Sequence, residues 1–300
     1  MGKTVIIIAG PTAAGKTALA IRLASHFDTA VISADSRQCY KEISIGTAKP
    51  SLQELQTVPH YFIDSHSIKE EVNAGIYERL SLQYAAHIWQ KRDVAIMCGG
   101  TGLYIKAFCE GFDNIPSAPA EIRQGINERY EKEGISWLQQ EVREKDPAFY
   151  AIAEIHNPQR LIRALEVLYA TGQSITTFRT ANTAARDFNI IKIGVTVPKE
   201  QLHANIEQRV HAMIAAGLVE EVRSVLPYRN HNALQTVGYT EIFDYLDGKT
   251  TLEEAIALII IHTRQYAKRQ LTWFRKDPAM QWFSPDDTTE ILNKLSIITR

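Results

Sequence analysis

Residues 10–17, with the sequence GPTAAGKT, constrain the fold of this chain more than any other feature. They match G-x-x-x-x-G-K-[ST], in which glycines let backbone N–H groups wrap a phosphate, the lysine adds a cation and the last hydroxyl can bind Mg²⁺. An apolar run at 4–9 precedes the motif, as a strand buried on both faces would. Motif and context together disfavour a chance glycine turn. The residues expected to hold a diphosphate are Gly10, Pro11, Thr12, Ala13, Ala14, Gly15, Lys16 and Thr17, with Thr17 as the Mg²⁺ ligand.

Apolar runs at 30–34, 61–63 and 94–97 alternate with segments of helical character. This alternation predicts an α/β fold with a doubly wound parallel sheet, like that of P-loop NTPases. Residues 115–183 contain helical periodicity without a strand run, and 190–197 again reads as a strand. We therefore predict an α/β catalytic core of residues 1–112 and 188–300, interrupted by a helical insertion domain at 113–187.

Composition excludes several classes of protein. Lys and Arg number 33 against 34 Asp and Glu, so any basic surface for a nucleic acid must be local. Three cysteines without a C-x-x-C pair exclude a disulfide framework and a cysteine-based zinc site. The longest apolar stretch, 255–261, is far shorter than the about 20 residues that cross a bilayer. We expect a cytoplasmic protein with no membrane partner, and a monomer.

Two polar segments follow apolar runs, where parallel strands present their carboxyl ends to ligands. In SADSRQ, residues 33–38, Asp35 is a candidate general base or Mg²⁺ ligand, and a turn cap is the alternative. In GGTGLY, residues 99–104, the glycines allow close approach to a ligand. Thr101 there can cap the next helix or bond a ligand oxygen.

Residues 157–172 predict a helix with Asn157 as N-cap and Gly172 just past its end. Arg160 and Arg163 fall in its first turns, where cations oppose the helix dipole. They should therefore have an anionic partner. That partner is either a carboxylate of the protein or an external phosphate.

A long helix is expected to open at Thr250, with a capping box to Glu253. Its apolar stripe is predicted to contain Leu252, Ile256, Ile259, Thr263, Ala267 and Phe274. Another face carries Arg264, Lys268 and Arg275, with His262, Arg269 and Lys276 beside them. This basic half-cylinder is either a solvated face or, as we favour, a footprint for a phosphate backbone.

Eight stretches together resemble one family, the bacterial tRNA dimethylallyltransferases (tRNA isopentenyltransferases), whose fold is similar to that of P-loop kinases. They are GPTAAGKT, ISADSRQCY, IGTAKP, PHYFID, GGTGLY, NPQRLIRALEV, VGYTEI and TRQYAKRQLTWFRKDP. The resemblance implies transfer of a dimethylallyl group from dimethylallyl diphosphate to N6 of the adenine 3′-adjacent to the anticodon. The tRNAs concerned read codons that begin with U, the product is N6-isopentenyladenosine, and Mg²⁺ is required.

The resemblance also implies roles for single residues. Lys16, Asp35, Thr101 and Arg209 would form the catalytic set, with Asp35 taking the N6 proton and Arg209 near the diphosphate. The insertion would contact the tRNA anticodon stem-loop. Together with the basic face, the expected tRNA-binding residues are Asp35, Ser36, Arg37, Gln38, Thr101, Arg123, Gln159, Arg160, Leu161, Ile162, Arg163, Arg264, Lys268 and Arg275. Departures from the family pattern at Lys41-Glu42-Ile43 and at His60-Tyr61 touch none of these residues.

Three other functions share the phosphate loop. A small-molecule kinase could use Asp35 as base or metal ligand, but would leave the basic face unexplained. A close relative of the main hypothesis would prenylate free AMP. An RNA-binding switch driven by a nucleotide would perform no chemistry on RNA.

Overall fold

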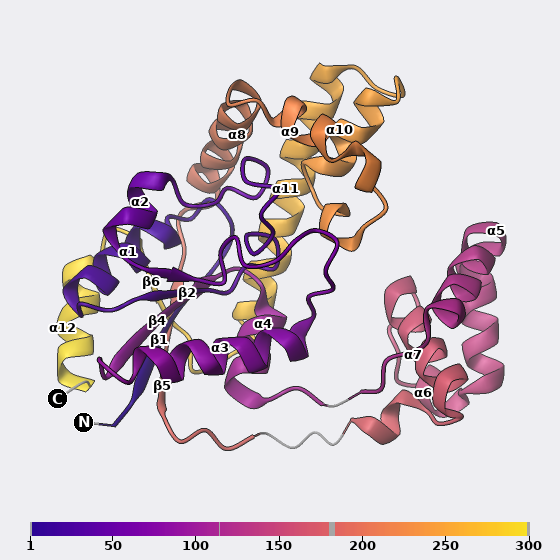
Figure 1. Ribbon diagram of the computed structural model, residues 1–300, viewed down its shortest axis with the longest axis horizontal. Coiled ribbons are helices and arrows are strands. Elements are labelled where there is room, and N and C mark those ends of the chain that lie inside the picture. The colour runs from indigo at the N-terminus through magenta and orange to yellow at the C-terminus, as the bar shows by residue number, and fades with distance from the viewer. Residues whose placement is uncertain (1, 114, 180–183, 299–300) are drawn as a thin grey trace. The chain divides into compact units, whose positions relative to one another are not determined.

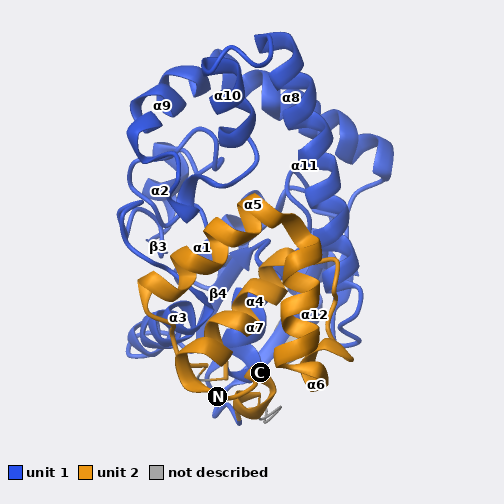
Figure 2. Cartoon of the chain, turned by 90° about the vertical axis from the view of Figure 1, so that its right-hand side faces the viewer, with its two compact units in different colours: residues 1–111, 185–300 blue, residues 112–184 orange. Residues whose placement is uncertain are grey.

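The computed structural model describes residues 2–113, 115–179 and 184–298. The chain divides into two compact units, residues 1–111 with 185–300 and residues 112–184 (Figure 2). The sequence had suggested 1–112 with 188–300, and 113–187, of which residues 114 and 180–183 lie outside the described part. No helix among the described residues is both long and apolar enough to cross a membrane.

Unit 1 is built on a six-stranded sheet in which all neighbouring strands are parallel, in the order β3-β2-β4-β1-β5-β6 (Figure 1). The strands are β1 Thr4–Ala9, β2 Val31–Ser33, β3 His60–Tyr61, β4 Val94–Gly99, β5 Asn189–Val195 and β6 Gln281–Phe283. Ala9 pairs with Gly99 and Gly194, so β1, β4 and β5 end within one residue of one another. The loops that follow these strands therefore start from one edge of the sheet.

The predicted doubly wound α/β fold is confirmed, with two corrections to its strands. β3 ends at Tyr61, because Phe62 turns to a positive φ of 63°, whereas the sequence suggested a run to residue 63. β6 was not predicted, since three residues carry too little pattern. The helices of unit 1 are α1 Lys16–His26, α2 Leu52–Thr57, α3 Ala74–Ile88, α4 Gly102–Glu110, α8 Lys199–Ala215, α9 Leu218–Ser224, α10 Tyr239–Leu246, α11 Leu252–Phe274 and α12 Thr288–Ile298.

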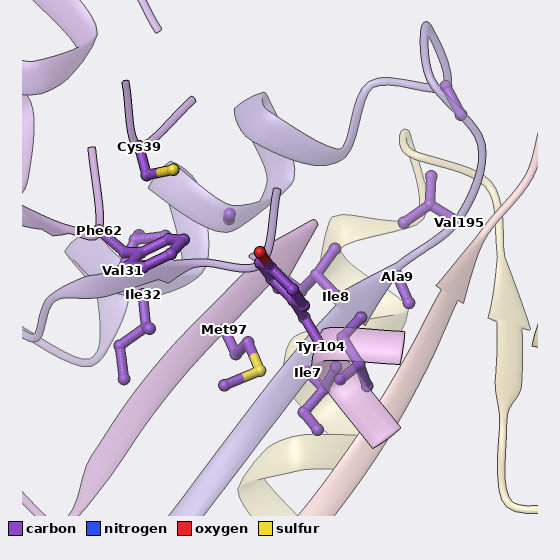
Figure 3. Close-up of a cluster of buried hydrophobic side chains, with 14 of the residues drawn as sticks. Ile7, Ile8, Ala9, Val31, Ile32, Cys39, Phe62, Met97, Tyr104 and Val195 are labelled. Carbon is purple, nitrogen blue, oxygen red and sulfur yellow. The ribbon is translucent and has the colours of Figure 1, made fainter. Parts of the chain in front are cut away.

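The core of unit 1 lies on both faces of its central strands. Residues 5–9 have no exposed surface, as a strand covered on both sides requires. Figure 3 shows part of this core, with side chains from β1, β2 and β4 near the rings of Phe62 and Tyr104. Burial raises the pKa of the Cys39 thiol to about 12, so this cysteine is a small core residue and not a nucleophile.

Within its described residues, the regular elements of unit 2 are all helices. It comprises α5 Ala120–Lys145, which is interrupted at Gly134, α6 Pro147–Tyr150, α7 Pro158–Thr171 and a 3₁₀ turn, Ile175–Phe178. The predicted helix α7 is confirmed with both its ends. Asn157 accepts a hydrogen bond from the Arg160 N–H at 3.4 Å, and Gly172 takes the left-handed conformation with φ 71°.

Helix α11 begins one residue later than predicted. Thr251, not Thr250, is the N-cap, and its capping box is completed by Glu254. The sequence offers both Thr–Glu pairs at the same spacing, so local pattern alone does not choose between them. The prediction of which residues form the apolar stripe is also partly wrong. Leu252 and Ile256 are only half-buried, and the buried positions are Ala255, Ile259, Ala267, Gln270 and Phe274.

Candidate active site

The phosphate loop connects β1 to α1 as the motif predicts. Gly10 passes so close to β5 that a Cβ on it would lie 2.4 Å from the Val195 carbonyl oxygen. Gly15 precedes the first turn of α1 with φ 87°, a conformation that side chains disfavour. The N-terminus of α1, with its free N–H groups and positive dipole end, therefore faces the loop and favours an anion.

A cavity of about 260 Å³ lies over this loop, and we call it the phosphate pocket. Lys16 and Arg209 both line it, and the Arg209 guanidinium donates to the Thr12 hydroxyl at 3.3 Å. Desolvation lowers the pKa of Lys16 to about 8, and burial also lowers the pKa of Arg209. Two cations in one desolvated pocket favour an anionic ligand. The structure thus brings together Lys16 and Arg209, which the sequence placed near one diphosphate.

Asp35 follows β2 and lines the phosphate pocket together with Thr17. Its Oδ1 accepts hydrogen bonds from the backbone N–H groups of Arg37 at 2.8 Å and Gln38 at 3.3 Å. Asp35 is therefore a turn cap, one of the predicted alternatives. Within the described residues both bonds go to one oxygen, so the other carboxylate oxygen is available for a proton or a metal ion.

The capping role predicted for the Thr101 side chain is wrong, and its bond to a ligand oxygen stays a prediction. It occupies the N-cap position of α4, but its side chain makes no capping hydrogen bond there. Its hydroxyl accepts from the Ser36 N–H at 3.0 Å, and its own N–H donates to the Ala34 carbonyl at 3.1 Å. Thr101 thus holds the segment on both sides of Asp35, and it lines neither the phosphate pocket nor its neighbour.

A second pocket of about 550 Å³ adjoins the first, a size typical of sites for small molecules. Asp35, Arg209 and Tyr266 line both pockets, so they lie where the two meet. Ser36 and Arg37 line the second pocket, whereas Gln38 lines the first.

Sequence reasoning missed several residues of the second pocket. Residues 235–238 and Thr240 line it next to a buried carboxylate, Glu241. Glu241 accepts from His262 Nδ1 at 2.6 Å and from the Gly238 N–H at 2.7 Å. The segment VGYTEI marks this wall in the sequence, but nothing in its residue types indicates a pocket.

The basic face of α11 is less uniform than predicted. Arg264 is paired with Glu207 of α8 at 3.0 Å, because α8 packs beside α11. His262 is bound to Glu241, so neither side chain belongs to a free basic half-cylinder. Lys268 and Arg275 remain exposed, and Arg269 lines the second pocket.

In unit 2 the anionic partners of the arginines are carboxylates of the protein. Glu166, whose side chain is only 3% exposed, accepts from Arg123 at 2.6 Å and from Arg163 at 3.1 Å. Arg160 is paired with the exposed Glu154 at 3.4 Å.

The neighbouring apolar positions behave differently from the prediction. Leu161 and Ile162 pack in the core of unit 2, with 0% and 5% exposure. Their side chains therefore cannot offer a surface to RNA, and only Gln159, Arg160 and Arg163 of this segment can.

The fold and the site define an α/β P-loop enzyme with a phosphate pocket that opens beside a second ligand pocket. Residues 38–277 match the family model described as IPP transferase. The tRNA dimethylallyltransferase of Cytophaga hutchinsonii is 50% identical over 291 residues, with 97% of this chain and 96% of the relative covered.

Solved structures agree with this match. The tRNA isopentenylpyrophosphate transferase from Bacillus halodurans superposes with a TM-score of 0.72 at 33% identity, covering 98% of this chain and 96% of that one. A eukaryotic dimethylallyltransferase acting on tRNA gives a TM-score of 0.72 at 27% identity, covering 90% and 69%. The chain belongs to the IPP transferase family and is a transferase.

Proposed function

We propose that this enzyme transfers the dimethylallyl group of dimethylallyl diphosphate to N6 of the adenine 3′-adjacent to the anticodon, in tRNAs that read codons beginning with U. One observation carries the proposal: a carboxylate, Asp35, lies at the junction of a phosphate pocket and a second pocket. The names of the relatives, which include enzymes acting on tRNA, support the choice of donor and acceptor.

The reaction balances with groups that the site supplies. The allylic C–O bond breaks and its electron pair leaves with the diphosphate, whose growing charge is stabilised by Lys16, Arg209 and the loop N–H groups. The N6 lone pair forms the new C–N bond. The proton released from N6 passes to the carboxylate oxygen of Asp35 that does not cap the turn. The products are N6-isopentenyladenosine and diphosphate.

Mg²⁺ fits the phosphate pocket. The Thr17 hydroxyl, which lines this pocket, offers it a hard oxygen ligand. Among the described residues no group of three or more His, Cys, Asp or Glu side chains could hold a metal. Bound at Thr17, Mg²⁺ would need further oxygen ligands from water and the diphosphate, as it commonly does. When bound, Mg²⁺ neutralises charge on the leaving group.

Recognition of the tRNA needs more than the pocket. We assign the anticodon stem-loop to cations of both units: the exposed Lys268 and Arg275 in unit 1, and in unit 2 Arg160 together with Arg123 and Arg163, which also hold the buried Glu166. The target adenine must leave its stack to enter the second pocket, as for other enzymes that modify bases. A monomer in the cytoplasm suffices for this proposal.

Mass spectrometry of nuclease-digested tRNA tests the function directly. After incubation with dimethylallyl diphosphate and Mg²⁺, one adenosine of the anticodon loop should gain a dimethylallyl group in place of a hydrogen. An unmodified adenosine would refute the proposal. ATP consumption without the donor would indicate a kinase, and equal prenylation of free AMP would indicate a nucleotide-modifying relative.

A further inference from the structure

Gln270 is a polar side chain buried in the middle of α11, with 6% exposure. Both ends of its amide are hydrogen-bonded. Its Oε1 accepts from the Thr12 N–H at 2.8 Å, and its Nε2 donates to the Gly100 carbonyl at 3.0 Å. Only a side chain with one acceptor and one donor can make this pair of bonds. Gln270 therefore ties the phosphate loop, after β1, to the loop after β4.

The absence of a side chain at Gly100 leaves room for the Gln270 amide. A Cβ on residue 100 would lie 2.1 Å from Gln270 Nε2, which is closer than any side chain allows. Any side chain at position 100 would therefore displace Gln270. The bond to Thr12 also commits one N–H of the phosphate loop to the protein. A diphosphate must then be held by the later N–H groups, from residues 13–17.

The loop after β4 connects Gln270 to the segment around Asp35, the proposed general base. Thr101 follows Gly100, donates its N–H to the Ala34 carbonyl and accepts from the Ser36 N–H. Asp35 lies between Ala34 and Ser36 in the chain. A continuous series of hydrogen bonds thus leads from Thr12, through Gln270 and residues 100–101, to the backbone on either side of Asp35.

We propose that Gln270 is a positioning residue that aligns the donor held by the phosphate loop with the acceptor that loses its proton to Asp35. The inference rests on the proposed function. Nucleophilic displacement of the diphosphate requires the attacking and leaving atoms to lie in line. A misplacement of about 1 Å can lower the rate about 10²-fold. Losing Gln270 should reduce turnover more than affinity, because Lys16 and Arg209 still hold the diphosphate.

Two variants test this role. Gln270→Met keeps the volume and removes both hydrogen bonds, whereas Gln270→Glu keeps the acceptor for Thr12 and removes the donor to Gly100. For both we expect single-turnover rates, at saturating donor and tRNA, to fall roughly 10- to 100-fold. The dissociation constants of donor and tRNA should stay within about threefold for Gln270→Met, whereas Gln270→Glu, which adds a carboxylate to the lining of the phosphate pocket, should also weaken donor binding. Gln270→Glu, which keeps one bond, carries the test if Gln270→Met does not fold.

Phe274→Leu is the matched control. It alters the buried face of the same helix and lines neither pocket, so it should lower the melting temperature and leave the rate unchanged. A rate within threefold of wild type in the Gln270 variants would overturn the inference. So would a rate that excess donor restores, since Gln270 would then shape only donor binding. Failure of the wild-type enzyme to modify tRNA would count against the proposed function instead.

Discussion

Replacing Asp35 by Asn separates the roles that its carboxylate can have. The amide oxygen of Asn can keep the two hydrogen bonds that Oδ1 accepts from the backbone of Arg37 and Gln38. The amide nitrogen then occupies the place of the other oxygen, which in the proposed reaction takes the N6 proton. The turn is preserved and only the base is lost.

The expected loss of turnover is about 10²- to 10⁴-fold, the range for a general base. This corresponds to about 3 to 5 kcal/mol of activation free energy. Donor affinity should change little, because the cations that line the phosphate pocket are untouched. Asp35→Ala, the control, removes the cap as well and should lower stability by a further amount of about 1 kcal/mol.

Three measurements on Asp35→Asn decide among these roles: the single-turnover rate on an anticodon stem-loop, the donor dissociation constant by calorimetry, and the melting temperature. A strong loss of donor affinity that added Mg²⁺ partly restores would show a metal ligand. A rate within threefold of wild type would refute the assignment of Asp35 as base. A lower melting temperature with unchanged rate would leave only the cap.

Three further expectations follow from the charges of the site and of unit 2. Because the pKa of Lys16 is held at about 8, this side chain is charged below pH 8. The kcat/KM for the donor should therefore fall about tenfold per pH unit above that value, and Lys16→Arg should show no such limb. Neutralising Lys268 and Arg275 together should weaken the binding of all accepted tRNAs equally in a filter-binding assay, since phosphate contacts do not read sequence. Loss of binding for one tRNA alone would contradict this. Replacing Arg163 and Arg123 by Gln should lower the unfolding free energy by about 1 to 3 kcal/mol, because buried Glu166 loses its partners. Arg160→Gln removes only the partner of the exposed Glu154, so it should lower the unfolding free energy by less.

The parts of the fold that the sequence predicts are those in which neighbours along the chain decide the outcome. A continuous apolar run with a glycine loop and a helix after it fixed β1, the phosphate loop and α1. Asn157 and Gly172 likewise marked both ends of α7. Thr250 and Thr251 are a counter-example, because two equivalent caps lie side by side and tertiary packing makes the choice.

Contacts between distant segments escaped the sequence for a different reason. Nothing near Arg264 shows that Glu207 lies beside it, and nothing near Glu166 shows that Arg123 of α5 shares it with Arg163. Charge patterns along one helix describe that helix in isolation. An ion pair with a second helix, such as that of Arg264 with Glu207, changes the charge that the basic face presents.

The second pocket and the hydrogen bonds that restrain the phosphate loop also depend on residues far apart in the sequence. Asn205 donates to the Ala13 carbonyl at 3.0 Å, and Gln270 holds Thr12. Glu221 accepts from three successive backbone N–H groups at residues 44–46, next to positions 46–48, which line the second pocket. Loops from the first hundred residues that line the two pockets are thus held by side chains from α8, α9 and α11. A phosphate loop alone is common to kinases and transferases. Side chains of the later helices therefore restrain this loop in ways that the motif itself does not specify.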